Sequence, residues 1–136
     1  MNDTPEKIIY EYCLLRYVPD LERGEFVNVG LMMMSKRHRW MRVGLHVDKE
    51  RIERLSPKAD ITRLRTQLGA FSPDGVPFPD LAPEERYRWM AAVKSAIIQT
   101  SPSHPGILIA VPACGREDAR RMLDSKFDEL LDRLVK

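Results

Sequence analysis

The chain has 136 residues, with ten prolines, seven glycines, two cysteines and a net charge of only +2. A chain of this length forms one domain of ordinary size, which buries about two-thirds of the surface that its unfolded form exposes. Cys13 and Cys114 belong to no CxxC or Cys/His cluster, which argues against a disulfide framework or a structural zinc site. Residues 1–7 lack the features of a secretory signal, and no apolar run approaches the roughly 18 residues of a membrane span. The sequence therefore predicts a cytoplasmic protein without a membrane segment.

The first third of the chain predicts three strands. Residues 7–18 and 26–34 are rich in aromatic and β-branched residues, and Pro19, Asp20 and Gly24 between them are typical of a turn. Strict alternation in the second strand would place one set of side chains on each face: Phe26, Asn28, Gly30, Met32 and Met34 on the first, and Val27, Val29, Leu31 and Met33 on the second. Both faces are mostly apolar, so we expect this strand to be central. Residues 39–47 alternate as well and predict a third strand beside the second.

The remainder predicts helices and one or two further strands. Asp48 and Asp60 are expected N-caps for helices at 49–55 and 61–71, Pro83 fits the first turn of a third helix, and 116–135 carries the apolar stripe of an amphipathic last helix. Prolines in 72–83 predict a surface loop, and 96–100 and 107–111 are strand candidates, the second of them buried. The predicted fold is α+β, one domain over 1–136 with a mainly antiparallel sheet and helices packed on at least one face.

The hairpin formed by the first two strands carries the polar residues Arg16, Glu25 and Asn28. In one interpretation they are a structural brace, in which Arg16 pairs with Glu25 across the hairpin and Asn28 holds the loop. In the other they form the floor of a binding pocket, where the guanidinium binds an anionic group and the amide and carboxylate orient it. An amide in a central strand must find hydrogen-bond partners or cost roughly 1 to 3 kcal/mol, so Asn28 has a partner in either interpretation.

A second polar group lies at residues 101–106, where Ser101, Ser103 and His104 could contact a ligand, although two prolines and a glycine suffice to explain a tight turn. Catalytic motifs are weak elsewhere. The three histidines are scattered, so no metal site is predicted. A nucleophile pair of Cys114 and His104 lacks an orienting third residue, and there is no glycine-rich phosphate loop. We therefore predict no catalytic residue and no cofactor.

Charge is unevenly distributed along the chain. Residues 36–65 hold ten Lys or Arg against four acids, whereas 1–35 hold three against six. Such asymmetry is typical of a surface for nucleic acid or an acidic partner. The alternative, which we favour, is that 36–39 form a solvated hairpin tip and the other basic residues line exposed helix faces. No recognised nucleic-acid-binding motif supports the first interpretation.

Several short motifs appear in order near the N-terminus: Tyr12, Arg16-Tyr17-x-Pro19, Arg23-Gly24-Glu25 and Asn28-Val29-Gly30. Later segments follow: 86–90, Lys94-Ser95, Ser101-Pro102, His104, Gly106 and 130–135. Together they resemble the bacterial domain-of-unknown-function family 3037, over nearly the whole chain. The resemblance implies no established activity. Members of that family are often encoded beside HipA-like serine/threonine kinases, which implies a regulatory partner or substrate of such a kinase, with Ser101 or Ser103 as phosphoacceptor.

Three classes of function remain open at this point. The first is a noncatalytic interaction or regulatory module, which the lack of a credible catalytic pair favours, with a homodimer through the last helix as one form of it. The second is a binding domain for a small anionic ligand or nucleic acid, based on Arg16, Asn28 and the basic segment. The third is a hydrolase-type enzyme with Glu25 as acid/base and Arg16 as electrostatic clamp, which would need a cleft and a shifted carboxyl pKa.

Overall fold

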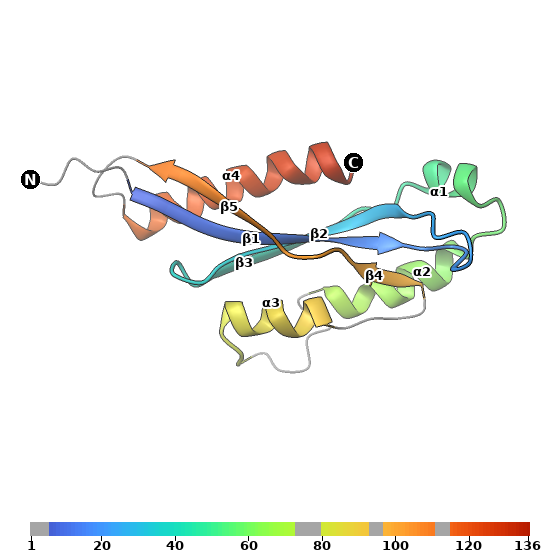
Figure 1. Ribbon diagram of the computed structural model, residues 1–136, viewed down its shortest axis with the longest axis horizontal. Helices are drawn as coiled ribbons and strands as arrows, with labels where there is room; N and C mark the ends of the chain where they lie inside the picture. Colours follow the sequence, from blue (N-terminus) through green and yellow to red (C-terminus); the bar gives the residue numbers. More distant parts are fainter. Residues whose placement is uncertain (1–5, 73–79, 93–96, 111–114) are drawn as a thin grey trace, which may run out of the picture.

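Strand β1 (Glu6–Tyr17) is the centre of an antiparallel sheet in the computed structural model, which describes residues 6–72, 80–92, 97–110 and 115–136 (Figure 1). On one side β1 pairs with β2 (Val27–Ser35), and β2 pairs with β3 (Trp40–Leu45). The expected N-terminal meander of three strands is therefore confirmed. Cys114 and most of the proline-rich segment 72–83 lie outside the described residues.

The other edge of β1 is occupied by two strands in succession. The first seven residues of β1 pair with β5 (His104–Ala110), and its last three pair with β4 (Ile98–Thr100). Between β4 and β5, Ser101 continues the ladder in a different way. Its amide donates to the Leu14 carbonyl at 2.8 Å, and its hydroxyl accepts from the Leu14 amide at 2.8 Å. The Ser101 hydroxyl therefore accepts the hydrogen bond that a backbone carbonyl would accept in an uninterrupted edge strand.

Strand β2 departs from strict alternation because it carries a β-bulge. Leu15 pairs with Gly30 and Arg16 pairs with Asn28, so Val29 is the extra residue on β2. Val29 is buried in one core and Leu31 in the other, although the alternation predicted that they share a face. The expectation that β2 is covered on both faces is correct, since every residue from Val29 to Ser35 is buried.

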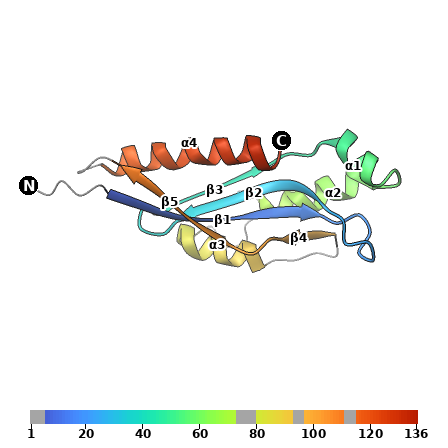
Figure 2. The ribbon, with the colours of Figure 1, turned by 45° about the horizontal axis from the view of Figure 1, so that its top comes forward.

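Helices cover the two faces of the sheet unequally (Figures 1 and 2). One face carries α1 (Lys49–Leu55), α2 (Ile61–Leu68), a 3₁₀ turn (Gly69–Phe71) and α3 (Pro83–Ala92). The other carries α4 (Arg116–Leu134). Asp48 and Asp60 are N-caps as predicted, because their carboxylates accept from the amides of Arg51 and Arg63 at 3.1 and 3.0 Å. The α+β fold class is confirmed.

Two separate hydrophobic cores result from this arrangement. The first lies between the sheet and α1 to α3, and its members are Cys13, Leu15, Tyr17, Val27, Val29, Met32, Met34, Ile52, Leu64, Leu68, Phe71, Tyr87, Met90 and Ile98. The second lies between the sheet and α4, and its members are Ile8, Tyr10, Leu31, Met33, Trp40, Ala110, Ala119, Leu123, Phe127, Leu130 and Val135. In the described part of the chain, no helix is both long enough and apolar enough to cross a lipid bilayer.

Strand β5 was expected to be buried, and this is wrong for one of its faces. Ala110 is buried against α4, but Ile107 and Ile109 are 56 and 59% exposed. The reason is that β5 is an edge strand covered by a helix on the α4 side alone, among the residues that the structure describes. Apolar character on both faces of a strand therefore did not mean burial of both faces.

Candidate functional site

Of the site residues predicted from the sequence, Arg16 and Asn28 are brought together. They are directly opposite on β1 and β2, so their side chains project from the same face of the sheet, the one that carries α4. The Asn28 amide donates to the carbonyl of Leu134 at 3.0 Å and so fastens the last turn of α4. The Arg16 guanidinium lies over the Phe26 ring, 4.3 Å from its centroid. Asn28 is thus a brace for the last helix and not for the hairpin loop.

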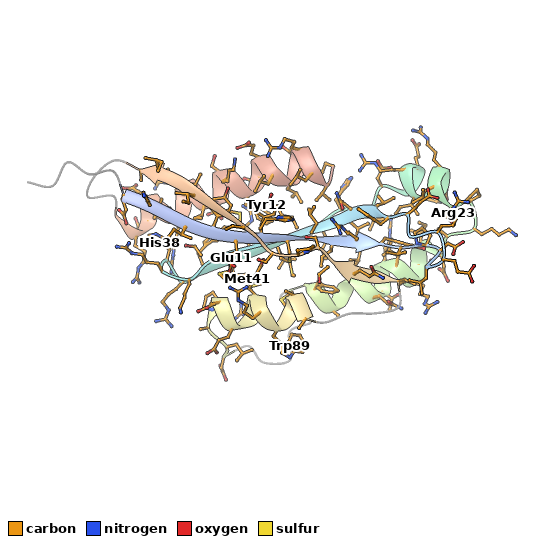
Figure 3. All side chains as sticks on the ribbon, viewed as in Figure 1. Glu11, Tyr12, Arg23, His38, Met41 and Trp89 are labelled. Atoms are coloured by element: carbon orange, nitrogen blue, oxygen red, sulfur yellow. The ribbon has the colours of Figure 1, made fainter. Side chains whose placement is uncertain are left out.

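Glu25 is turned away from Arg16 and pairs with Arg23 instead. The Arg23 Nε donates to the Glu25 carboxylate at 2.6 Å, and both side chains are exposed on the loop between β1 and β2. Figure 3 shows Arg23 at the end of the molecule farthest from the N-terminus. Glu25 borders a hollow of about 310 Å³ between this loop and the α1–α2 connection, together with Pro19 and Lys58. Since the pair is solvated, we expect it to contribute less than about 1 kcal/mol.

Ser101 and His104 lie apart from the hairpin residues. Ser101 is buried and its hydroxyl is used in the ladder with Leu14, which leaves it inaccessible to a kinase in this fold. His104 is exposed and stacks on Tyr12, with 5.3 Å between the ring centroids. The second proposed phosphoacceptor, Ser103, is exposed, but its hydroxyl is hydrogen-bonded to the hydroxyl of Tyr87 at 2.7 Å.

The structure reveals a buried polar cluster that the sequence did not indicate. Burial raises the pKa of the Cys13 thiol, which lies beside the hydroxyl of Tyr87. Burial likewise raises the pKa of the Tyr87 hydroxyl, which the bond to Ser103 partly offsets. Both groups are therefore neutral at physiological pH, and a neutral buried thiol is a poor nucleophile. We interpret the cluster as a means of satisfying the Tyr87 hydroxyl under α3.

The described residues offer little support for a metal site or for a nucleic-acid surface. Over the described ranges 6–72, 80–92, 97–110 and 115–136, no three His, Cys, Asp or Glu side chains come close enough to bind a metal ion. The basic segment 36–65 does not form one surface either. Arg42 pairs with Asp124 and Asp128 on α4, while Arg51 donates to the carbonyls of Val135 and Lys136. Lys36, in contrast, pairs with Glu84 of α3 on the other face, so the charges of the segment are divided and partly neutralised, which weakens the case for nucleic acid.

His38 is an exception to the expected solvated hairpin tip. Lys36, Arg37 and Arg39 are exposed as predicted, but His38 is buried, at 7% exposure. Arg120 of α4 donates to the His38 carbonyl at 3.3 Å and holds the turn against that helix. Burial lowers the pKa of the imidazole, and Arg37, Arg116 and Arg120 lower it further while Glu6 raises it. The turn is therefore part of the folded core at this end of the sheet.

The most conspicuous surface feature lies where β1 and β5 pair beyond α3. Three successive cross-strand pairs share this face, Lys7 with Ile109, Ile9 with Ile107, and Glu11 with Pro105. Ile9, Ile107 and Ile109 are 59, 56 and 59% exposed, although isoleucine is among the residue types most often buried. We call Ile9, Pro105, Ile107 and Ile109 the isoleucine shelf. Figure 1 shows the stretch where β1 and β5 lie side by side near the start of β1, beyond the end of α3.

A groove of about 610 Å³ runs along the shelf, between β1 and the β2–β3 turn. Its apolar lining includes Ile9, Met34 and Pro105, and its rim is basic, with Lys7, Lys36 and Arg37. The acid in the groove, Glu11, is bound to Arg88 of α3, and Glu84 of the same helix lies 3.5 Å from Lys36. Figure 3 shows Glu11 on the α3 side of the sheet, the face on which the groove lies. The shelf therefore combines exposed apolar area with positive charge.

Sequence reasoning missed the shelf because it depends on pairing across about a hundred residues. Ile9 and Ile107 are each unremarkable in a strand, and only their opposition on β1 and β5 makes a continuous surface. One signal was present. Both strands are apolar at odd and at even positions, so two helical layers would be needed to cover the sheet along its whole length.

Taken together, the molecule is an α+β domain with a five-stranded antiparallel sheet, two cores and an exposed apolar groove. The family model described as "Protein of unknown function (DUF3037)" matches residues 12–114, and the chain belongs to this family. The resemblance drawn from the sequence motifs is thereby confirmed. No curated protein and no solved structure was found to match the chain.

Proposed function

We propose that the protein is a noncatalytic interaction module that binds a partner protein on the isoleucine shelf. The observation that carries the proposal is the exposure of three adjacent isoleucines, each more than half accessible, beside a groove of about 610 Å³. Removing this apolar area from water would stabilise a complex, because the hydrophobic effect scales with the apolar area buried. Contiguous apolar surface of this kind is typical of sites where proteins associate.

The charge around the shelf indicates what kind of partner fits it. Two copies of this chain packed shelf to shelf would bring Lys7, Lys36 and Arg37 of each against the same residues of the other, and like charges in contact oppose association. A helix with an apolar stripe and acidic residues beside it would place its stripe on Ile9 and Ile107 and its carboxylates against the basic rim. We therefore favour an acidic amphipathic segment of another protein over a homodimer.

The family resemblance supplies a first partner to test, since such proteins are often encoded beside HipA-like kinases. In this proposal the kinase, or a protein that it regulates, contributes the acidic segment. A role for Ser101 or Ser103 as phosphoacceptor would require local opening, because the first is buried and the hydroxyl of the second is bonded to Tyr87. The shelf needs no such rearrangement.

The test is a comparison of two matched variants, Ile107→Asp on the shelf and Leu21→Asp at the opposite end of the sheet. Both side chains are exposed to the same degree, 56 and 57%, so the two substitutions change surface charge alike. Proteins captured from the native host by the wild type would be identified by mass spectrometry, and the best specific one would be purified and titrated. We expect Ile107→Asp to weaken its binding at least tenfold and Leu21→Asp to leave it unchanged.

Equal affinities of the two folded variants would contradict the proposal, as would a captured protein whose binding does not weaken when salt is raised, since the basic rim predicts such a dependence. Sedimentation of the isolated protein tests the alternative. A concentration-dependent dimer that Ile107→Asp abolishes would replace the acidic partner by a second copy of the chain.

A further inference from the structure

A second site lies at the other end of β1, on the opposite face of the sheet, and it does not depend on the shelf. Arg16 has Asn28 of β2 directly opposite on one side and Gln99 of β4 on the other. Side chains directly opposite in antiparallel strands project from the same face. A guanidinium therefore lies between two side-chain amides in one row across three strands.

The orientation of the guanidinium is set by its surroundings. Its central carbon lies 4.3 Å from the centroid of the Phe26 ring, and its Nε is buried without a hydrogen-bond partner. Stacking on an aromatic ring holds the plane of a guanidinium while leaving its two terminal nitrogens free to bind. The side chain is half-buried, so part of the hydration of its charge is already lost.

Arg42 shows what a similar arrangement does elsewhere in the same molecule. Its guanidinium also stacks on a phenylalanine, with 4.5 Å to the centroid of Phe127, but it binds the carboxylates of Asp124 and Asp128 at 3.4 and 3.0 Å. Arg16 has the ring and, within the described residues, no carboxylate. Arg16 thus has the same kind of aromatic contact as Arg42 but lacks the carboxylate partners of Arg42.

We propose that Arg16 binds the carboxylate of a small organic acid, with the exposed side-chain amide of Gln99 beside it as a hydrogen-bond donor. Asn28 lies beside Arg16 but does not bind the acid, because its Nδ2 donates to Leu134 and its buried Oδ1 can only accept a hydrogen bond. A single guanidinium fork matches a monoanionic carboxylate, which accepts two parallel hydrogen bonds. A phosphate dianion would need more positive charge, but the loop after β1 is net negative, with Asp20, Glu22 and Glu25 against Arg23.

The experiment is an NMR titration of the arginine Nε–Hε groups of the whole protein, with sodium acetate and disodium succinate as probes. Sodium chloride and inorganic phosphate at the same ionic strength serve as comparisons. We expect one Nε–Hε signal, the one that Arg16→Gln removes, to shift and saturate with acetate and succinate. A shift that stays linear, or that chloride reproduces, would overturn the proposal, and tighter binding of phosphate would overturn the choice of a carboxylate.

Three further variants keep the result interpretable. Arg16→Lys retains the charge without the fork and should bind acetate at least tenfold more weakly, so equal binding would show that charge alone is responsible and contradict the bidentate geometry. Arg42→Gln should leave the acetate response unchanged, since its carboxylates are internal. If Arg16→Gln fails to fold, the wild-type titration and Arg16→Lys decide. Ile107→Asp should bind acetate normally, which separates this site from the proposed partner surface.

Discussion

The two halves of β1 carry similar side chains but differ in burial on the face that bears α2 and α3. In the second half, Cys13, Leu15 and Tyr17 are buried in the core formed with these helices. In the first half, Ile9 projects from the same face and is 59% exposed. Glu11 lies between these two halves, and Arg88 of α3 binds its carboxylate. Burial along this strand is therefore decided by how far α3 extends and not by the hydrophobicity of the strand.

The opposite face differs, because α4 covers the first half of β1. Ile8 and Tyr10 are buried against it, and Arg120 of α4 holds the β2–β3 turn beside them. The first half of β1 is consequently packed against α4 on one face and exposed to solvent on the other. A protein that needs apolar surface for binding can have it there without losing its core.

The largest expected effect tests whether the covered half carries the stability. Leu15→Ala should lower the free energy of unfolding by about 2 to 5 kcal/mol, because it leaves a cavity between the sheet and its helices. Ile107→Ala in the open half should change it by less than about 0.5 kcal/mol. Urea denaturation followed by circular dichroism measures both. Similar losses for the two variants would show that the shelf is covered in solution, and the comparison would fail.

A smaller effect is expected where the covered half meets the end of α4. Asn28→Ala removes the hydrogen bond to the Leu134 carbonyl and should cost about 1 kcal/mol. Amide exchange in the last turn of α4 should accelerate while that of its first turns stays unchanged. Gln99→Ala, which removes an exposed amide on the other side of Arg16, is the control. Uniform acceleration along α4 would mean that Asn28 stabilises the whole fold and not this contact.

The smallest effect concerns the open end and its dependence on pH. The pKa of His38 is lowered in the folded protein by burial, so the unfolded chain takes up the proton first as pH falls. Stability from this group is therefore complete above about pH 6.5, the ordinary histidine value, and is lost as pH falls below it. Thermal unfolding of wild type and His38→Gln between pH 5 and 8 measures the difference. A difference that does not change with pH would show that His38 titrates normally when folded.

Much of the fold could be predicted from local signals. Two aspartate caps, the N-terminal meander and the last helix each follow from residues close in sequence, and all agree with the structure. The pairing of β5 with β1 could not be predicted, because nothing in residues 104–110 specifies a partner strand about a hundred residues away. The exposure of Ile107 depends on that pairing and was missed with it.

The predicted site shows the same division between local and distant information. Arg16 and Asn28 were correctly associated because adjacent strands of a hairpin determine their opposition. The bond from Asn28 to Leu134 joins residues that are 106 apart, and the sequence offers no signal for it. Glu25 was grouped with Arg16 on proximity along the chain, but the nearer Arg23 binds its carboxylate.

The extra residue in β2 has a consequence for how this sequence tolerates change in length. Val29 shifts the phase of the strand, so that Asn28 reaches the α4 side while Val27 and Val29 enter the other core. Because Val29 is the extra residue, its loss would remove the bulge and leave Asn28 opposite Arg16 and Gly30 opposite Leu15, so that no side chain changes face. A single-codon deletion at position 29 would thus leave Asn28 in reach of the last helix, as would one in the loop at 21–24. One at Met32, inside the regular ladder, would turn one segment of the strand over.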